Sequence, residues 1–90
     1  MSDTVTVKLA KPVTHNETSY SELTFREPTV GDLILGDRET TQLAKMTTIL
    51  ASISETPLPA FKKISAKDFK AIVAATSALM GNDKTDTTGD

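Results

Sequence analysis

The chain has 90 residues, a formal net charge of −2 and no cysteine. This charge excludes the basic field that nucleic-acid binding requires, and the absence of cysteine excludes disulfide bonds, thiol nucleophiles and thiolate metal sites. Hydrophobic residues make up 38% and aromatic residues 4% of the sequence, so a single domain of this length has a thin core that self-association would supplement.

The start of the chain, Met1–Thr4, lacks the basic and apolar segments of a signal peptide. No apolar run approaches the ~20 residues that a membrane-spanning helix needs. We therefore expect a cytoplasmic protein whose partner is neither a membrane nor a nucleic acid.

Two strands are predicted in the N-terminal part. Apolar and polar residues alternate over residues 4–10, and Pro12 is expected to end this strand because it has no N–H for a sheet. The alternation returns over residues 20–26, where Leu23 and Phe25 lie on the inner face. Strands this close in the sequence predict an antiparallel hairpin, whose apolar face must be covered by helices.

The next segment changes from strand to helix. Pro28 ends the second strand, and Thr29 with Asp32 three residues later is typical of a capping box. A short helix is therefore predicted over residues 29–35, and Gly36 is expected to end it in the left-handed conformation.

A longer helix is predicted over residues 38–54, with Asp37 as its cap. Large apolar residues recur along it at intervals of three and four, which forms one stripe. Thr56–Pro59 then breaks the helix, since a residue before proline disfavours the helical conformation. The stripe consists of Leu43, Met46, Leu50 and Ile53.

Ser65 and Asp68 predict a second capping box, and a last helix is expected from there to Met80. Phe69, Val73 and Met80 belong to its apolar stripe. Residues 82–90 contain no large apolar residue, so they are predicted to be a disordered polar tail. The whole pattern predicts an α+β fold: a hairpin followed by two to three helices packed on one face, in a single domain over residues 1–81.

No arrangement of residues indicates catalysis or a cofactor. His15 is the only histidine and lies in a predicted polar loop over residues 14–19, without a nucleophile placed beside it. Capping and the helix dipole account for Asp32 and Asp68. The aspartates of the tail lack the spacing and closing glutamate of a calcium loop. We therefore predict that the protein is not an enzyme and binds no metal.

One local basic cluster is present, formed by Lys62, Lys63, Lys67 and Lys70. It has two interpretations, a docking site for an acidic partner or a solvated helix face. The sequence leaves both open.

The run Leu23-x-Phe25-Arg26-x-Pro28-Thr29-x-x-Asp32, followed later by Ile64-Ser65-x-x-Asp68-Phe69 before the last helix, resembles the tail assembly chaperones of contractile-tailed bacteriophages related to Mu. The resemblance covers about residues 5–80. By this resemblance the motif positions are mainly architectural: Pro28, Thr29 and Asp32 set the start of a helix, and Arg26 pairs with a carboxylate. These positions are Leu23, Phe25, Arg26, Pro28, Thr29, Asp32, Ser65 and Asp68.

The resemblance implies a protein of the host cytoplasm that binds the phage tape measure protein and keeps it soluble before the tail tube polymerises. Such a protein is absent from the mature virion. It also implies a second, C-terminally extended product made by translational frameshifting, and self-association is a further expectation. The alternative is a minor structural component of the virion tail.

We hypothesise that the apolar stripes of the two longer helices bind the tape measure protein, as a groove that receives a helix. The methionines suit this role because their side chains adapt to varied partners. The alternative is that both stripes are used up in the core of the monomer. The candidate residues are Leu43, Met46, Leu50, Ile53, Phe69, Val73 and Met80.

Overall fold

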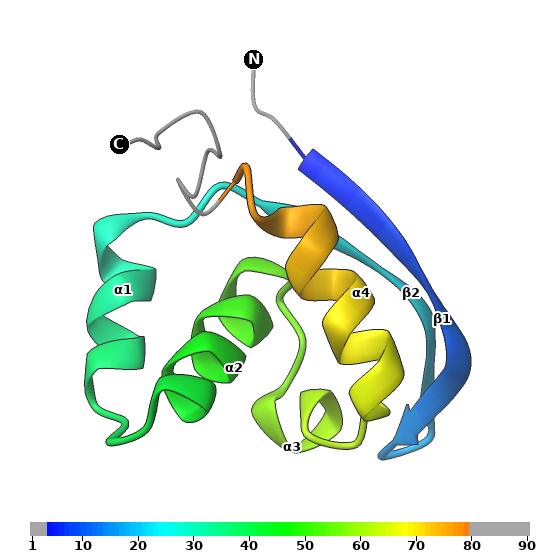
Figure 1. Ribbon diagram of the computed structural model, residues 1–90. Coiled ribbons are helices and arrows are strands. Elements are labelled where there is room, and N and C mark those ends of the chain that lie inside the picture. Colours follow the sequence, from blue (N-terminus) through cyan, green and yellow to red (C-terminus); the bar gives the residue numbers. More distant parts are fainter. Residues whose placement is uncertain (1–3, 80–90) are drawn as a thin grey trace.

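The computed structural model describes residues 4–79, and the predicted α+β fold with an N-terminal antiparallel hairpin is confirmed (Figure 1). Met80 and the predicted disordered tail over residues 82–90 lie outside the described residues. The elements are β1 (Thr4–His15), β2 (Thr18–Arg26), α1 (Val30–Asp37), α2 (Gln42–Ile53), α3 (Leu58–Phe61) and α4 (Ala66–Thr76).

The hairpin turn is tighter than the sequence predicted. Only Asn16 and Glu17 lie between the strands, and both have positive φ values, 50° and 66°. Two consecutive residues with positive φ are typical of a two-residue hairpin turn, whose twist matches that of the strands. The predicted polar loop over residues 14–19 was therefore wrong, because its flanking residues pair with each other, His15 with Thr18.

The prediction that Pro12 ends the first strand was wrong, because β1 continues to His15. The pairing register shifts between Lys8 and Val13, so this part of β1 contains more residues than the part of β2 opposite. Pro12 lies inside the irregularity, where its missing N–H interrupts no regular ladder bond. The strand therefore continues beyond the proline to His15.

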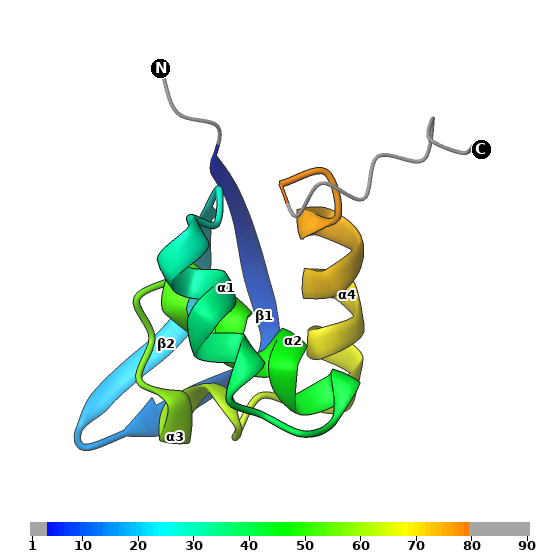
Figure 2. The ribbon, with the colours of Figure 1, turned by 90° about the vertical axis from the view of Figure 1, so that its left-hand side faces the viewer.

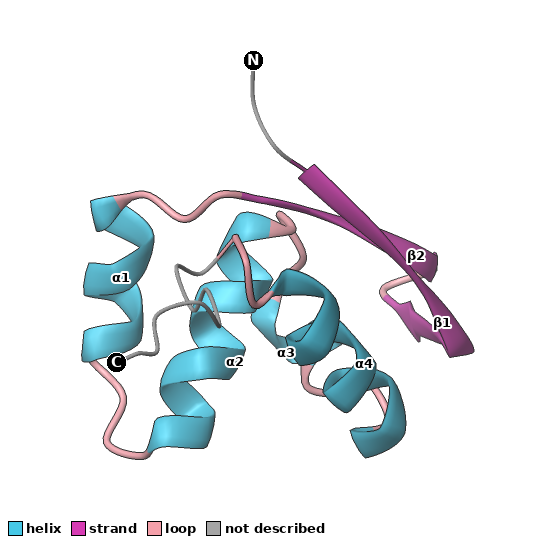
Figure 3. Ribbon diagram, turned by 45° about the horizontal axis from the view of Figure 1, so that its top comes forward, coloured by secondary structure: helices cyan, strands magenta, loops and turns pink. Residues whose placement is uncertain are grey.

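The hydrophobic core lies between the inner face of the hairpin and the helices (Figures 1 and 3). The ring of Phe61 contacts the rings of Phe25 and Phe69 edge to face, with centroids 6.5 Å and 6.3 Å apart. Leu50 and Ile72 are fully buried beside them. The three aromatic rings thus join β2, α3 and α4, so the helices cover the apolar face of the hairpin as predicted.

Helix α1 has a different position from the other helices. It packs against α2 and lies on the side of α2 away from the hairpin in the view of Figure 1; in the view of Figure 2 it is drawn in front of the strands. The prediction that Gly36 ends this helix in a left-handed conformation was wrong. Gly36 is a buried residue inside α1, and the helix extends to Asp37.

The other helix boundaries also differ from the predicted ones. Helix α2 begins at Gln42 and is capped by Thr41, whose hydroxyl accepts from the N–H of Ala44, whereas a start near Arg38 was predicted. The connector after α2 contains the short helix α3, which was not predicted. Helix α4 ends at Thr76, before the predicted end at Met80.

Candidate functional site

The junction between β2 and α1 is held by an ion pair. The guanidinium of Arg26 donates two hydrogen bonds to Asp32, at 2.8 Å to Oδ2 and 3.3 Å to Oδ1. The N–H of Thr29 donates to the Asp32 carboxylate at 2.7 Å, and the Thr29 hydroxyl accepts from the Asp32 N–H. The predicted capping box is therefore present, and Ser52 adds a hydrogen bond to Asp32 from α2.

These donors explain the protonation state of Asp32. The hydrogen bond from Arg26 holds the pKa of this carboxyl well below its usual range, and donors on Ser52 and Thr29 act in the same direction against desolvation by burial. A carboxylate that stays ionised and fully bonded is a poor general acid or base at neutral pH. The role of Asp32 here is to join β2, α1 and α2.

Asp68 makes a different contact from the predicted one. The Ser65 hydroxyl caps α4 by accepting from the Asp68 N–H, as expected. The carboxylate of Asp68, however, accepts from the backbone N–H groups of Ala10 and Lys11, at 3.0 Å each. These two donors hold its pKa below the usual range. Asp68 thus attaches the start of α4 to the irregular part of β1.

The residues proposed as a partner-binding stripe are divided between core and surface. Leu50 and Ile53 are 0% and 1% exposed, so they belong to the core. Leu43 is 64% exposed. Met46, Phe69 and Val73 are half-buried and pack against the core, and Met80 lies outside the described residues.

Two of these residues line the same groove. Leu43 from the first turn of α2 and Phe69 from α4 enclose, with their neighbours, a mainly apolar groove of about 250 Å³. This is below the ~300–1,000 Å³ of sites that enclose small molecules, so the groove has the size to receive side chains of a macromolecule. The groove is lined by Leu43, Thr47, Phe61, Lys62, Ile64, Ala66 and Phe69.

Helix α1 presents a second apolar surface, which was not among the predicted binding residues. Val30, Leu33, Ile34 and Leu35 are 71%, 49%, 59% and 39% exposed. The buried positions of this helix are instead Asp32 and Gly36. Asp32 and Gly36 are four residues apart, so they lie on one face of the helix. This spacing is the sequence signal that could have indicated that the aliphatic residues between and before them face outward. We call the four aliphatic residues the α1 face.

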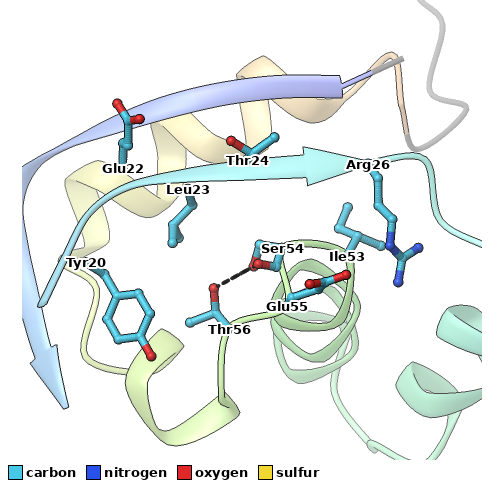
Figure 4. Close-up of a pocket in the computed structure, with 9 residues that line it drawn as sticks. All are labelled: Tyr20, Glu22, Leu23, Thr24, Arg26, Ile53, Ser54, Glu55 and Thr56. Atoms are coloured by element: carbon cyan, nitrogen blue, oxygen red, sulfur yellow. Dashed lines mark hydrogen bonds between the residues drawn. The ribbon is translucent and has the colours of Figure 1, made fainter. Parts of the chain in front are cut away.

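A larger cavity of about 420 Å³ lies between β2 and the segment that follows α2 (Figure 4). Within it the hydroxyls of Ser54 and Thr56 lie 2.9 Å apart, and Arg26 is paired with Asp32. Within residues 4–79 no three histidine or acidic side chains are grouped so that they could hold a metal ion.

The described part of the chain also contains no helix that is long and apolar enough to cross a membrane. Among the described residues, the groove and the α1 face are exposed apolar surfaces. Both are suited to binding apolar side chains of another protein.

Comparison with known proteins gives one assignment. The family model described as "Phage tail assembly chaperone proteins, E, or 41 or 14" matches residues 6–81, which include all of the helices and nearly all of the hairpin. No curated protein and no solved structure matches the chain. The chain therefore belongs to the family of phage tail assembly chaperones.

Proposed function

We propose that this chaperone binds the phage tape measure protein in the host cytoplasm, keeps it soluble before the tail tube polymerises, and is absent from the finished virion. The binding involves no catalytic turnover. Support comes from membership of the family and from the apolar groove. Residues 4–79 share one hydrophobic cluster, which supports the further proposal that residues 1–81 act as a single domain.

The groove is the observation on which this proposal depends. Its lining combines large apolar side chains from α2, α3, α4 and the segment before α4, among them Leu43, Phe61 and Phe69. Tape measure proteins are long and helical, with apolar stripes that aggregate unless they are covered. An amphipathic helix binds a groove of this kind through side chains spaced three and four residues apart.

Co-expression with the tape measure protein tests the proposal. We expect the wild-type chain to move the tape measure protein into the soluble fraction and to co-purify with it. Leu43→Asp places a charge in the groove at a position that is 64% exposed, so the fold is retained while binding is lost. Ala74→Asp, on the exposed side of α4 and outside the groove, is the matched control and retains binding.

An insoluble, unbound tape measure protein in the presence of the wild-type chain would contradict the proposal. Mass spectrometry of purified phage particles tests whether this protein is absent from the virion. Detection of the protein in the particles would favour the alternative, a minor structural component of the tail. The same method applied to infected cells tests for a C-terminally extended frameshift product of this chain.

A further inference from the structure

The two apolar surfaces of this molecule have flanking charges of opposite sign. On α1, Val30, Leu33 and Ile34 occupy positions i, i+3 and i+4, the spacing of a helix that anchors in a groove. Position i+7 is Asp37, which is exposed, and Glu27 is exposed just before the helix. Arg38 is the one exposed cation in residues 27–38, so the flanks of the α1 face are acidic overall.

The groove has the opposite charge at its rim. Lys62 lines it directly. Lys67 and Lys70 are exposed on the first two turns of α4, whose residues Ala66 and Phe69 form one wall. Lys70 follows Ala66 by four residues, so both lie on the same side of the helix. A helix that brings apolar anchors and an acidic end would match both the groove and its rim.

The residues of this sequence outside the described range are poor in apolar side chains that could cover the α1 face. Residues 1–3 and 80–90 contain only two large apolar residues, Met1 and Met80. The α1 face presents four aliphatic side chains that are each at least 39% exposed. Among the described residues, the surface that matches this face in apolar character and in flanking charge is the groove, which a second copy of the protein would present.

We propose that α1 of one molecule docks in the groove of a second copy. Val30, Leu33 and Ile34 then contact Leu43, Phe61 and Phe69 of that copy, and Asp37 approaches its lysine rim. The interface joins two different surfaces, so each pair still has one free α1 face and one free groove. This self-association does not depend on the identity of the client, although a client helix in the groove would compete with α1.

Mixing two variants provides the decisive test, with the molar mass measured by light scattering over a range of protein concentrations. Wild-type protein is expected to increase in mean mass above the monomer as the concentration rises. Ile34→Asp disables the α1 face and Leu43→Asp disables the groove, so each variant alone stays monomeric. An equimolar mixture forms heterodimers, because the intact groove of the first variant receives the intact α1 of the second.

Three results would overturn the proposal: a wild-type chain that is monomeric at every concentration, self-association that survives both substitutions, or folded variants that fail to combine. Circular dichroism confirms that each variant is folded. If Ile34→Asp is unfolded, Val30→Asp replaces it, since Val30 is 71% exposed at the first position of α1, where an acidic residue is favoured.

The charge contribution is tested separately. Lys62→Glu combined with Lys67→Glu is expected to abolish self-association, and adding Asp37→Lys and Glu27→Lys to this variant restores it. Lys8→Glu, an exposed charge reversal on β1, is the control and leaves self-association intact. Failure of the compensating substitutions to restore any association would contradict the pairing of these two flanks.

Discussion

At the residue scale, Asp68 carries a contact between parts of the chain almost 60 residues apart. Its two carboxylate oxygens each accept one backbone N–H, from Ala10 and from Lys11. These donors lie where the ladder between β1 and β2 is irregular, so the strand cannot supply their partners in the regular way. The side chain of a helix-cap residue therefore completes the hydrogen bonding of the strand.

Asp68→Asn is expected to expose these two amides. Asparagine offers one carbonyl oxygen in place of two, and its NH₂ group would face the second backbone donor. We expect hydrogen exchange at Ala10 and Lys11 to accelerate in Asp68→Asn, with a lower free energy of unfolding. Ser65→Ala is the matched control: it removes the cap of α4 while keeping the carboxylate, so the amides of Ala10 and Lys11 stay protected.

The sequence predicts the caps and misses the carboxylate of Asp68. The spacing of Thr29 to Asp32 and of Ser65 to Asp68 is the same, and both hydroxyls accept the expected N–H. The two carboxylates have different hydrogen-bond partners. Asp32 accepts from the side chains of Arg26 and Ser52, whereas Asp68 accepts from backbone N–H groups in the irregular part of β1. Such partners come from tertiary packing, which a local spacing rule does not contain.

At the element scale, α1 depends on close approach to α2. A Cβ atom at Gly36 would lie 2.7 Å from Cγ1 and 2.8 Å from Cδ1 of Ile49, and 3.2 Å from the carbonyl oxygen of Lys45. A Cβ at Gly31 would meet only the hydroxyl oxygen of Thr29, at 3.6 Å. The two glycines of one helix therefore differ in the space available to a side chain.

Replacing each glycine by alanine separates these effects. Alanine is favoured over glycine in a helix by about 1 kcal/mol, so Gly31→Ala is expected to raise stability by nearly that amount. At Gly36 the same gain is opposed by overpacking, which costs about 1–3 kcal/mol, so Gly36→Ala is neutral or destabilising. Thermal unfolding gives the comparison, and equal melting temperatures would contradict a tight contact between α1 and α2.

The sequence predicts that α1 exists but not which way it faces. Gly36 was interpreted as a helix end because glycine commonly follows the last turn, whereas here it permits contact with Ile49. The buried polar residue Asp32 turns the opposite side of the helix, with Ile34, towards solvent. The usual rule that apolar residues face inward fails for α1, because its inner side is occupied by Asp32, which pairs with Arg26, and by Gly36.

At the scale of the whole molecule, the strand-then-helix order and the family resemblance were sufficient to predict the fold class and the general role. The groove was predictable only in part. Leu43 and Phe69 were among the candidate residues, but Phe61 and Ile64 belong to the connector between α2 and α4. Which of them share a wall depends on the packing of four separate segments.

The response of the whole fold to acid follows from its two bonded aspartates. Folding lowers the pKa of both Asp32 and Asp68, so the unfolded chain binds protons at a higher pH than the folded chain. Their contribution to stability is complete above the unfolded pKa, roughly 3.9, and is lost as the pH falls through the lower folded values. The free energy of unfolding should therefore be insensitive to these groups near neutral pH and decrease below about pH 4.

Asp32→Asn tests this dependence through urea unfolding at a series of pH values. The amide cannot form the ion pair with Arg26, and it leaves donors of Thr29 and Ser52 with a weaker acceptor, so at pH 7 we expect a loss of about 1–3 kcal/mol. Because the wild-type carboxylate becomes protonated in acid, the difference between the two proteins should shrink as the pH falls below about 4. A difference that stays constant across the series would mean that the charge of Asp32 does not hold β2, α1 and α2 together.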